Sequence, residues 1–411
     1  MNADPDTPET PEAPEPAECP EGPDEETLAR AALTRVLEPG EAAGGRWLAA
    51  HGARALLDLL TGPEESAEAA LTGVRAERLA GCRARARAAD PHRDLALHQA
   101  LGGRFVHPGT PEWPTQLDDL GDARPIGLWL RGRPHLRLWC LRAVAVVGAR
   151  ACTPYGAHVA GELGAQLAEH GWTLLSGGAY GIDAAAHRGA LAAAGATGAV
   201  LACGLDTPYP RGHAELLARV ADSGLLIGEL PPGEHPTRAR FITRNRVIAA
   251  LSRGTVVVEA AHRSGSLSTA RHALALGRQV MGVPGPVTSG MSAGVHELLR
   301  TGGGHLVTNA AEIVEMVGAI GELAPNPPPE ARPRDLLDPD TARLLEAFSA
   351  GAEHPPHWLA RASDTAPDEV IGRLYELHSL GFVERVGDRW RLARVSRARA
   401  AESDPDRRAA S

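Results

Sequence analysis

The middle of the chain carries short, continuous apolar runs, each about as long as one buried strand. Between them, apolar residues recur every three or four positions, which is the spacing of a helix. The predicted strands are 143–147, 173–175, 199–202, 225–227, 255–259, 280–283 and 305–307. The helices are expected to begin near Pro154, Ile182, His213, Ile242, Ser266 and Ala293. This alternation predicts an α/β fold with an extended, Rossmann-like, doubly wound and mostly parallel sheet.

The patterns on either side of this region predict further parts. In chain order we expect a disordered acidic, proline-rich tail (1–25), a small helical domain of the SAM or helix-hairpin kind (26–90), a connector (91–137), the sheet domain (138–318), a linker (319–337), a winged-helix domain (338–395) and a second disordered tail (396–411). Gly45 and Gly52 are expected to break the early helices. The arginines at 83, 85 and 87 are interpreted as a solvated helix face.

Charge is distributed unevenly along the chain. The net charge is -9, but residues 1–27 hold ten acidic side chains and no basic one, so the remainder is close to neutral. All 42 basic residues are arginine. Each of them is a planar, permanently charged fork that suits phosphate. The absence of lysine also excludes a Walker A loop, and with it ATP hydrolysis of that type.

Other features bound the compartment and the chemistry. No apolar run approaches the ~20 residues that span a bilayer, and the acidic amino terminus is unlike a signal peptide. The five cysteines are odd in number and lack CxxC spacing, which argues against metal sites and disulfides. We therefore expect a cytoplasmic protein without a metal, a cofactor or a membrane partner.

Two successive predicted strands end in glycine-containing loops that lead into helices. Candidate contacts in these loops are Gly148, Arg150, Ser176, Gly177 and Gly178. In a parallel sheet both loops lie at the carboxyl edge, where ligands of open α/β folds bind. Glycine allows close backbone approach, and free N–H groups at helix starts attract anions. The pattern predicts an anion or phosphate site.

Later loops at the same edge add further candidates, which are Asp183, His187, Tyr209, Arg211, Ser264, Gly265, Ser266 and Thr269. An aromatic ring beside a cation, as in Tyr209 and Arg211, is what base stacking with phosphate pairing requires. Asp183 is expected to orient backbone or an arginine, because a bare carboxylate repels phosphate. For His187 two interpretations stay open, namely a contact to phosphate or base and a histidine satisfied against the sheet.

The densest basic cluster is RARFITRNRVIAALS, which contains Arg238, Arg240, Arg244 and Arg246. Asn245 lies between the last two arginines. Arg240 and Arg244 are four positions apart and share a helix face. Few acidic residues follow, so we interpret Arg240, Arg244, Asn245 and Arg246 as candidate anion contacts rather than as a solvated face.

The segments VGARACTPYG, SGGAYGIDAAAH, GLDTPYPRGH, FITRNRVIAALS, VVVEAAHRSGSLSTARHALALGR and VPGPVTSGMSAG occur in this order. They resemble the DNA-processing protein A family (DprA, also called Smf) over about residues 140–305. The resemblance implies a non-enzymatic homodimer that binds single-stranded DNA and loads the RecA recombinase in natural transformation and recombination. It also places Arg150, the Ser176–Gly178 turn and the Arg244–Arg246 set in the DNA pocket. Tyr180 and Ala214 depart from it, since relatives are often basic there.

Two alternatives remain at this stage. One is a nucleotide-processing enzyme of the phosphoribohydrolase type, in which Glu259 is the candidate catalytic residue, although the PGGxGTxxE motif of that family is missing. The other is an interaction scaffold that works through the winged helix. A dinucleotide site is disfavoured, because GxGxxG and an acidic ribose anchor are absent.

Overall fold

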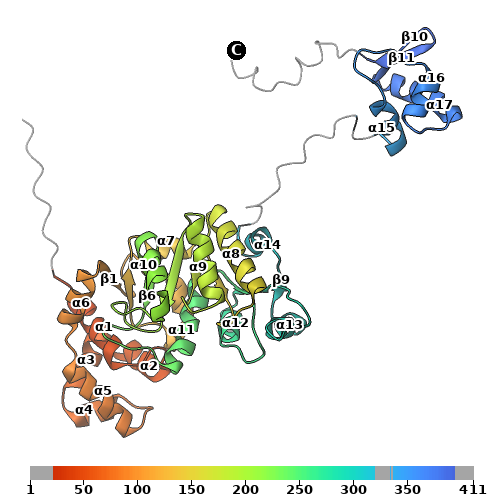
Figure 1. Ribbon diagram of the computed structural model, residues 1–411. Coiled ribbons are helices and arrows are strands. Elements are labelled where there is room, and N and C mark those ends of the chain that lie inside the picture. Colours follow the sequence, from red (N-terminus) through yellow and green to blue (C-terminus); the bar gives the residue numbers. More distant parts are fainter. Residues whose placement is uncertain (1–21, 320–333, 335–336, 394–411) are drawn as a thin grey trace, which may run out of the picture. The chain divides into compact units, whose positions relative to one another are not determined.

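The computed structural model describes residues 22–319, 334 and 337–393. The chain forms two compact units, Met1–Leu323 and Ala324–Ser411 (Figure 1). Most of both predicted tails and most of the predicted linker lie outside the described residues. Within the described ranges, no helix combines the length and the apolar character needed to cross a membrane.

The first unit begins with six short helices. They are α1 (Glu25–Val36), α2 (Ala42–His51), α3 (Ala53–Thr61), α4 (Glu64–Ala70), α5 (Ala76–Ala88) and α6 (Pro91–Ala100). Asp24 starts α1 by accepting a hydrogen bond from the Thr27 amide at 2.7 Å, as an N-cap does. Leu33, Leu56 and Leu60 are fully buried in the core that the helices share.

One of the two predicted helix breaks is wrong. The chain does break at Gly52, whose φ of 76° lies in the left-handed region. Gly45 instead lies inside α2, where a Cβ atom would come 1.8 Å from the Asp122 carbonyl oxygen. The glycine is needed because another backbone segment approaches the helix closely.

Of the three α5 arginines that were predicted to form a solvated face, one differs from the prediction, because Arg83 is buried whereas Arg85 and Arg87 are exposed. Arg83 is buried and donates to the carbonyl oxygens of Pro63 and Gly62 at 3.1 and 3.0 Å. Arg85 donates to the Val36 carbonyl oxygen at 2.9 and 2.7 Å. Both side chains satisfy carbonyl groups at helix ends, so their role is structural.

Nine strands form one sheet in the order β1-β2-β6-β5-β4-β3-β7-β8-β9. The strands are β1 (Gly103–Val106), β2 (Leu128–Arg131), β3 (Ala143–Val147), β4 (Thr173–Ser176), β5 (Thr197–Leu201), β6 (Leu225–Gly228), β7 (Gly254–Val257), β8 (Gln279–Gly282) and β9 (His305–Leu306). The strands from β6 to β9 along this order pair in parallel. The predicted α/β class is confirmed.

The region predicted to be a connector takes part in the sheet. It supplies β1 and β2, the 3-10 segment η1 (Thr115–Ala123) and the short helix α7 (Leu136–Cys140). β2 pairs antiparallel with both β1 and β6. Trp129 of β2 is fully buried, and its indole nitrogen donates to the Thr34 hydroxyl of α1 at 3.3 Å. This strand therefore joins the helical region to the sheet.

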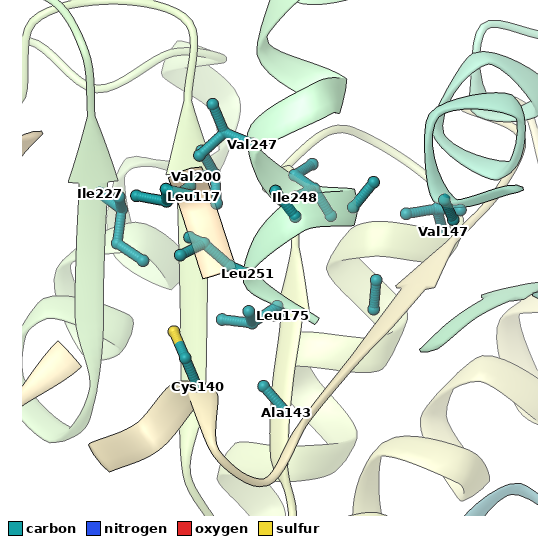
Figure 2. Packing of buried hydrophobic residues seen from close by; sticks show 14 of the residues in the cluster. Leu117, Cys140, Ala143, Val147, Leu175, Val200, Ile227, Val247, Ile248 and Leu251 are labelled. Atoms are coloured by element: carbon teal, nitrogen blue, oxygen red, sulfur yellow. The ribbon is translucent and has the colours of Figure 1, made fainter. Parts of the chain in front are cut away.

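Helices cover both faces of the sheet. They are α8 (Pro154–Glu169), α9 (Ile182–Ala192), α10 (Ala214–Ser223), α11 (Arg238–Leu251), α12 (Ser266–Ala275), α13 (Ala293–Arg300) and α14 (Ala310–Val317), with a 3-10 turn η2 (Arg211–His213) before α10. Figure 2 shows Val247, Ile248 and Leu251 of α11 packed over the strands. Alternate strand residues pack on the other side with α8 and α14. The predicted start of α11 near Ile242 is thus one turn late.

The second unit contains three helices followed by a hairpin. These are α15 (Pro339–Glu346), α16 (Pro356–Ala362), α17 (Pro367–Ser379), β10 (Val383–Val386) and β11 (Arg389–Leu392). Leu344, Leu359, Leu374 and Trp390 form its core. The order of elements is the predicted one, and the assignment as a winged helix stays a prediction.

Candidate functional site

A pocket of about 800 Å³ opens at the carboxyl edge of the sheet, where the chain order reverses. After β3 the chain adds β4, β5 and β6 on one side, and it then returns to add β7 on the other side of β3. The loops after β3 and β7 diverge at such a switch point and leave room between them. The pocket is lined by these two loops and by the first turns of α11 and α12.

The loop after β3 presents a cation to the pocket. Gly148 allows a tight turn, because a Cβ atom there would lie 2.5 Å from the Ile182 side chain. The Ala149 amide donates to the Glu259 carbonyl oxygen at 2.7 Å, which ties this loop to the loop after β7. Arg150 then projects outward, with its guanidinium 4.6 Å from the centroid of the Phe241 ring. This distance is that of a cation–π contact.

The first turns of α11 form a second wall. Thr237 caps the helix by accepting from the Arg240 amide at 3.2 Å. Arg238 is exposed and Phe241 half-buried, and both line the pocket. Tyr209 is 42 % exposed, and its ring lies 5.7 Å from that of Phe241. Two aromatic rings and two arginines therefore meet on one side of the pocket.

Arg244 lies at the floor of the pocket and is only 6 % exposed. Its Nη1 atom donates to the Gly177 carbonyl oxygen at 2.9 Å and to the Val200 carbonyl oxygen. Burial lowers the pKa of its guanidinium to about 10, and the charge of Asp183 opposes that shift. The Nε atom of Arg244 has no partner in the part of the chain that the structure describes.

Asp183 is the only acidic residue among the described residues that line the pocket. Its Oδ2 atom accepts from the amides of Gly177 and Ala179 at 3.0 and 3.4 Å. Burial raises the pKa of this carboxyl, and the nearby charge of Arg244 works in the opposite direction. Asp183 thus orients the loop after β4, as predicted from sequence.

The loop after β7 forms the third wall. Ser264, Gly265, Ser266 and Thr269 all line the pocket at the start of α12. The hydroxyls of Ser264 and Ser266 lie 2.7 Å apart. The side-chain Nδ2 atom of Asn245 donates to the Gly265 carbonyl oxygen at 3.2 Å and to the Ser268 hydroxyl at 2.8 Å. Asn245 therefore connects α11 to this loop.

Seven predicted contacts lie outside the pocket lining, and they are Ser176, Gly177, Gly178, His187, Arg211, Arg240 and Arg246. The Ser176 hydroxyl donates to the Val146 carbonyl oxygen at 2.6 Å and is fully buried. Arg244 packs directly on Gly177 and leaves no room for a larger residue there, because a Cβ atom would lie 2.4 Å from the Nη2 atom of Arg244. The turn after β4 therefore supports Arg244 from behind.

His187 is a core residue. Its Nδ1 atom lies 2.7 Å from the Thr197 hydroxyl, and the ring is fully buried. Burial lowers the pKa of His187 to about 3, so the ring is neutral near pH 7. Of the two interpretations left open by the sequence, the geometry supports a histidine held against the sheet through Nδ1, and its Nε2 atom has no hydrogen-bond partner among the described residues.

Arg246 and Arg240 face away from the pocket, on the side of α11 toward the early helices. Arg246 makes two hydrogen bonds to Glu229, at 2.8 and 2.7 Å, and both side chains are buried. Arg240 pairs with Glu38 and Glu234 at 2.9 and 2.8 Å. Their charges are thus already neutralised by carboxylates.

Among the pocket residues that are absent from the sequence-based set, three carry a charge or an aromatic ring, and they are Arg238, Phe241 and Arg263. Arg238 and Arg263 are exposed, and the guanidinium of neither makes an ion pair or a hydrogen bond with any described residue. Arg238 and Phe241 are three positions apart, which is a shared helix face. Arg263 directly precedes the predicted serine-glycine loop. Both signals were present in the sequence.

The geometry also bears on the enzymatic alternative. Glu259 is 1 % exposed and is not part of the pocket lining. Its two carboxylate oxygens accept from the Thr153 amide at 2.9 Å and from the Thr153 hydroxyl at 2.6 Å. This carboxylate holds the start of α8. Within the described ranges, no group of three or more His, Cys, Asp or Glu side chains is arranged to hold a metal ion.

Fold and pocket together define a Rossmann-like protein with a cationic, aromatic-lined pocket at the switch point of its sheet. The family described as DNA recombination-mediator protein A matches residues 104–318. A DprA-type DNA processing protein of Mycobacterium tuberculosis is 45% identical over 392 residues, covering 92% of this chain and 97% of that protein. Protein Smf of Escherichia coli is 39% identical over 265 residues, covering 62% of this chain and 69% of Smf.

A solved structure agrees with these matches. The crystal structure of DNA processing protein A from Streptococcus pneumoniae superposes with a TM-score of 0.56 at 31% identity, covering 72% of this chain and 95% of that one. The chain belongs to the DNA recombination-mediator protein A family, the DprA/Smf family of DNA processing proteins. The resemblance carried by the sequence motifs is confirmed.

Proposed function

We propose that this protein binds single-stranded DNA in the switch-point pocket. The observation that carries the proposal is that Arg150, Arg238 and Arg263 line one pocket together with Phe241, whose ring lies 4.6 Å from the Arg150 guanidinium. None of the three guanidiniums is paired with a carboxylate of a described residue. Arginine forks match phosphate oxygens, and an aromatic ring accepts any unpaired base by stacking.

The pocket favours a single strand over a duplex. Bases of a duplex are stacked on one another and cannot lie on Phe241 or Tyr209, whereas bases of a single strand can. Arginines on three different segments, namely two loops and the start of α11, suit successive phosphates of a polymer better than one nucleotide. Contacts to phosphate and to base faces predict little preference for sequence.

A salt series tests this proposal. We expect filter binding to show tighter retention of a single-stranded oligonucleotide than of its duplex. Arg150→Ala, Arg238→Ala and Arg263→Ala should each weaken binding and flatten the slope of log affinity against log salt by about 0.7. Arg300→Ala removes a charge from an exposed position outside the pocket and serves as the control. Unchanged slopes in all three pocket variants, or a preference for duplex, would overturn the proposal.

A second variant series tests the stacking role separately. Phe241→Ala should weaken binding by about 1–3 kcal/mol without changing the salt slope, because a stacked ring carries no charge. Phe241→Trp should retain most of the affinity. An altered slope in Phe241→Ala would show that the ring acts by placing Arg150 rather than by stacking.

We further propose that the bound strand is handed to the RecA recombinase, in DNA processing and natural transformation in the cytoplasm, and that the protein acts as a homodimer without catalysing a reaction. Family membership supports these roles. Sedimentation analysis of the purified protein measures the oligomeric state. Recombinase assembly on single strands coated with a single-strand binding protein, with and without this chain, measures loading.

A further inference from the structure

Four of the N–H groups of Arg240 donate to protein acceptors. Its Nε and Nη2 atoms donate to the two carboxylate oxygens of Glu38 at 3.0 and 2.9 Å. Its Nη1 atom donates to Glu234 and to the His235 carbonyl oxygen, each at 2.8 Å. The side chain is 15 % exposed. A phosphate could reach this guanidinium only by displacing one of the carboxylates.

The network extends from Arg240 into the early helices. Glu234 also accepts from Arg35 of α1 at 3.3 Å. Arg35 binds both oxygens of Asp94 in α6 at 2.8 and 2.7 Å, and it donates to the Pro232 carbonyl oxygen at 2.8 Å. One bidentate arginine–carboxylate pair joins α1 to α6, and the other joins the loop after α1 to the first turn of α11. Glu234, in the loop before α11, accepts one hydrogen bond from each of the two arginines. Bidentate pairs fix orientation as well as distance.

The loop after α1 packs against the same side of α11. At Gly40 a Cβ atom would lie 2.7 Å from the Arg246 Nε atom and 2.8 Å from the Thr243 methyl group. The opposite side of this helix start carries Arg238 and Phe241, which line the pocket. The start of α11 is thus held by contacts with the early helices on one side, and its other side lines the pocket.

We infer that Arg240 is a positioning residue, and that its pairing with Glu38 lets the amino-terminal helices set the pose of Arg238 and Phe241. The helical region then strengthens DNA binding without touching DNA. Preorganised side chains bind more tightly because less ordering is left for the moment of binding. We call the contacts of Arg240 with Glu38 and Glu234 the clamp. The effect of the clamp on DNA affinity rests on the proposed function, whereas the clamp itself is a property of the free protein.

The sign of one substitution separates this role from simple electrostatics. Glu38→Gln removes a negative charge from the neighbourhood of the pocket, so long-range attraction alone would tighten DNA binding. Under the clamp, Glu38→Gln should weaken binding about five- to tenfold, and Arg240→Ala should do the same. Neither should change the salt slope, because no phosphate contact is lost, whereas Arg238→Ala flattens it by about 0.7.

The swapped pair Glu38→Arg with Arg240→Glu should recover part of the affinity. Glu297→Gln on α13 removes the same charge at an exposed pair outside the pocket, and it should leave binding within about twofold of the parent chain. Tighter binding by Glu38→Gln, or a flatter slope in Arg240→Ala, would overturn the inference.

Hydrogen exchange of the free protein provides a readout that does not depend on DNA. Amides of residues 238–243 should exchange faster in Glu38→Gln and in Arg240→Ala than in the parent chain or in Glu297→Gln. Unchanged exchange would refute the clamp even if DNA binds. Faster exchange together with no DNA binding by the parent chain would refute the proposed function and keep the clamp.

Discussion

Arg238, Arg240, Arg244 and Arg246 belong to one helix, yet their guanidiniums lie in four different environments. The first is exposed at the pocket, the second joins an ion-pair network, the third bonds to buried carbonyl groups, and the fourth pairs with a buried glutamate. Successive residues of a helix are turned by about 100°. Positions two apart therefore face nearly opposite directions, and one basic motif divides into contact, positioning and support.

His187 supplies a prediction at this scale. Its folded-state pKa of about 3 lies below the ordinary value of 6.5. As pH falls below 6.5, His187 becomes protonated in the unfolded chain but stays neutral in the folded chain. The free energy of unfolding should therefore fall by about 1.4 kcal/mol per pH unit from this site alone, down to about pH 3, and the site should have no effect above pH 7.

Urea unfolding at pH 7 and pH 5 measures this effect. His187→Gln keeps a side chain able to bond to the Thr197 hydroxyl but does not titrate, so it should lose less stability between the two pH values than the parent chain. Equal losses in the two proteins would show that His187 does not contribute to acid sensitivity.

Among the elements, α11 connects the pocket to the rest of the first unit. Its last two turns are buried all round, including Arg244, Asn245 and Arg246 as well as the apolar residues. These two turns have no polar face toward water, so their charged residues need partners inside the protein. Glu229, at the end of β6, supplies the partner of Arg246. The strand order of the sheet brings these two residues together.

The Glu229–Arg246 pair yields a prediction for this element. Either Glu229→Gln or Arg246→Met should lower the free energy of unfolding by about 3–5 kcal/mol, because each leaves a buried group without its partner. The double variant Glu229→Leu with Arg246→Met should recover most of the loss. Chemical denaturation measures all three variants. A double variant as unstable as the sum of the single ones would contradict the account of a buried pair.

At the scale of the whole molecule, the amino-terminal helices and the sheet form one unit, and the helices after the linker form another. The first unit is held together by Trp129 in the sheet core and by the clamp between α1 and α11. Charge is also arranged at this scale. The most acidic stretch, before α1, is in the same chain as a pocket that is rich in unpaired arginine.

Deleting residues 1–21 tests the effect of this charge distribution. The segment contains seven acidic side chains and no basic one. Its removal should raise affinity for single-stranded DNA at low salt, because repulsion of the strand is relieved, and the gain should shrink as salt rises. A variant with these acidic residues changed to glutamine should match the deletion. A gain that persists at high salt would point to a cause other than charge.

Much of the fold could be predicted from the chain itself. All seven predicted strands are present, since buried parallel strands must be continuously apolar. The parts of the fold that were predicted wrongly have sequence patterns that fit more than one structure. β2 is only four residues long and is surrounded by proline and tryptophan, so its region was predicted to be a connector rather than part of the sheet. Gly45 was interpreted as a helix breaker, although it marks a close contact inside a helix.

The site was predictable in place but not in detail. Glycine and serine loops after parallel strands necessarily meet at one edge, and Gly148, Arg150 and the Ser264–Ser266 loop do line the pocket at that edge. Whether a given arginine is free or paired depends on carboxylates far away in the chain. Glu38 is about two hundred positions from Arg240, and no local pattern relates them.

The sequence by itself determined the α/β class, the sheet edge at which the pocket opens, the phosphate-suited chemistry of a chain whose basic residues are all arginine, and the family. These follow from periodicity, turn chemistry and residue type, which are local properties. The tertiary structure decided which arginines face the pocket, that Asp183, His187 and Glu259 serve the framework, and that the early helices brace α11. Those outcomes depend on long-range contacts, because a charge near the pocket is free to bind only if the fold brings no carboxylate to it.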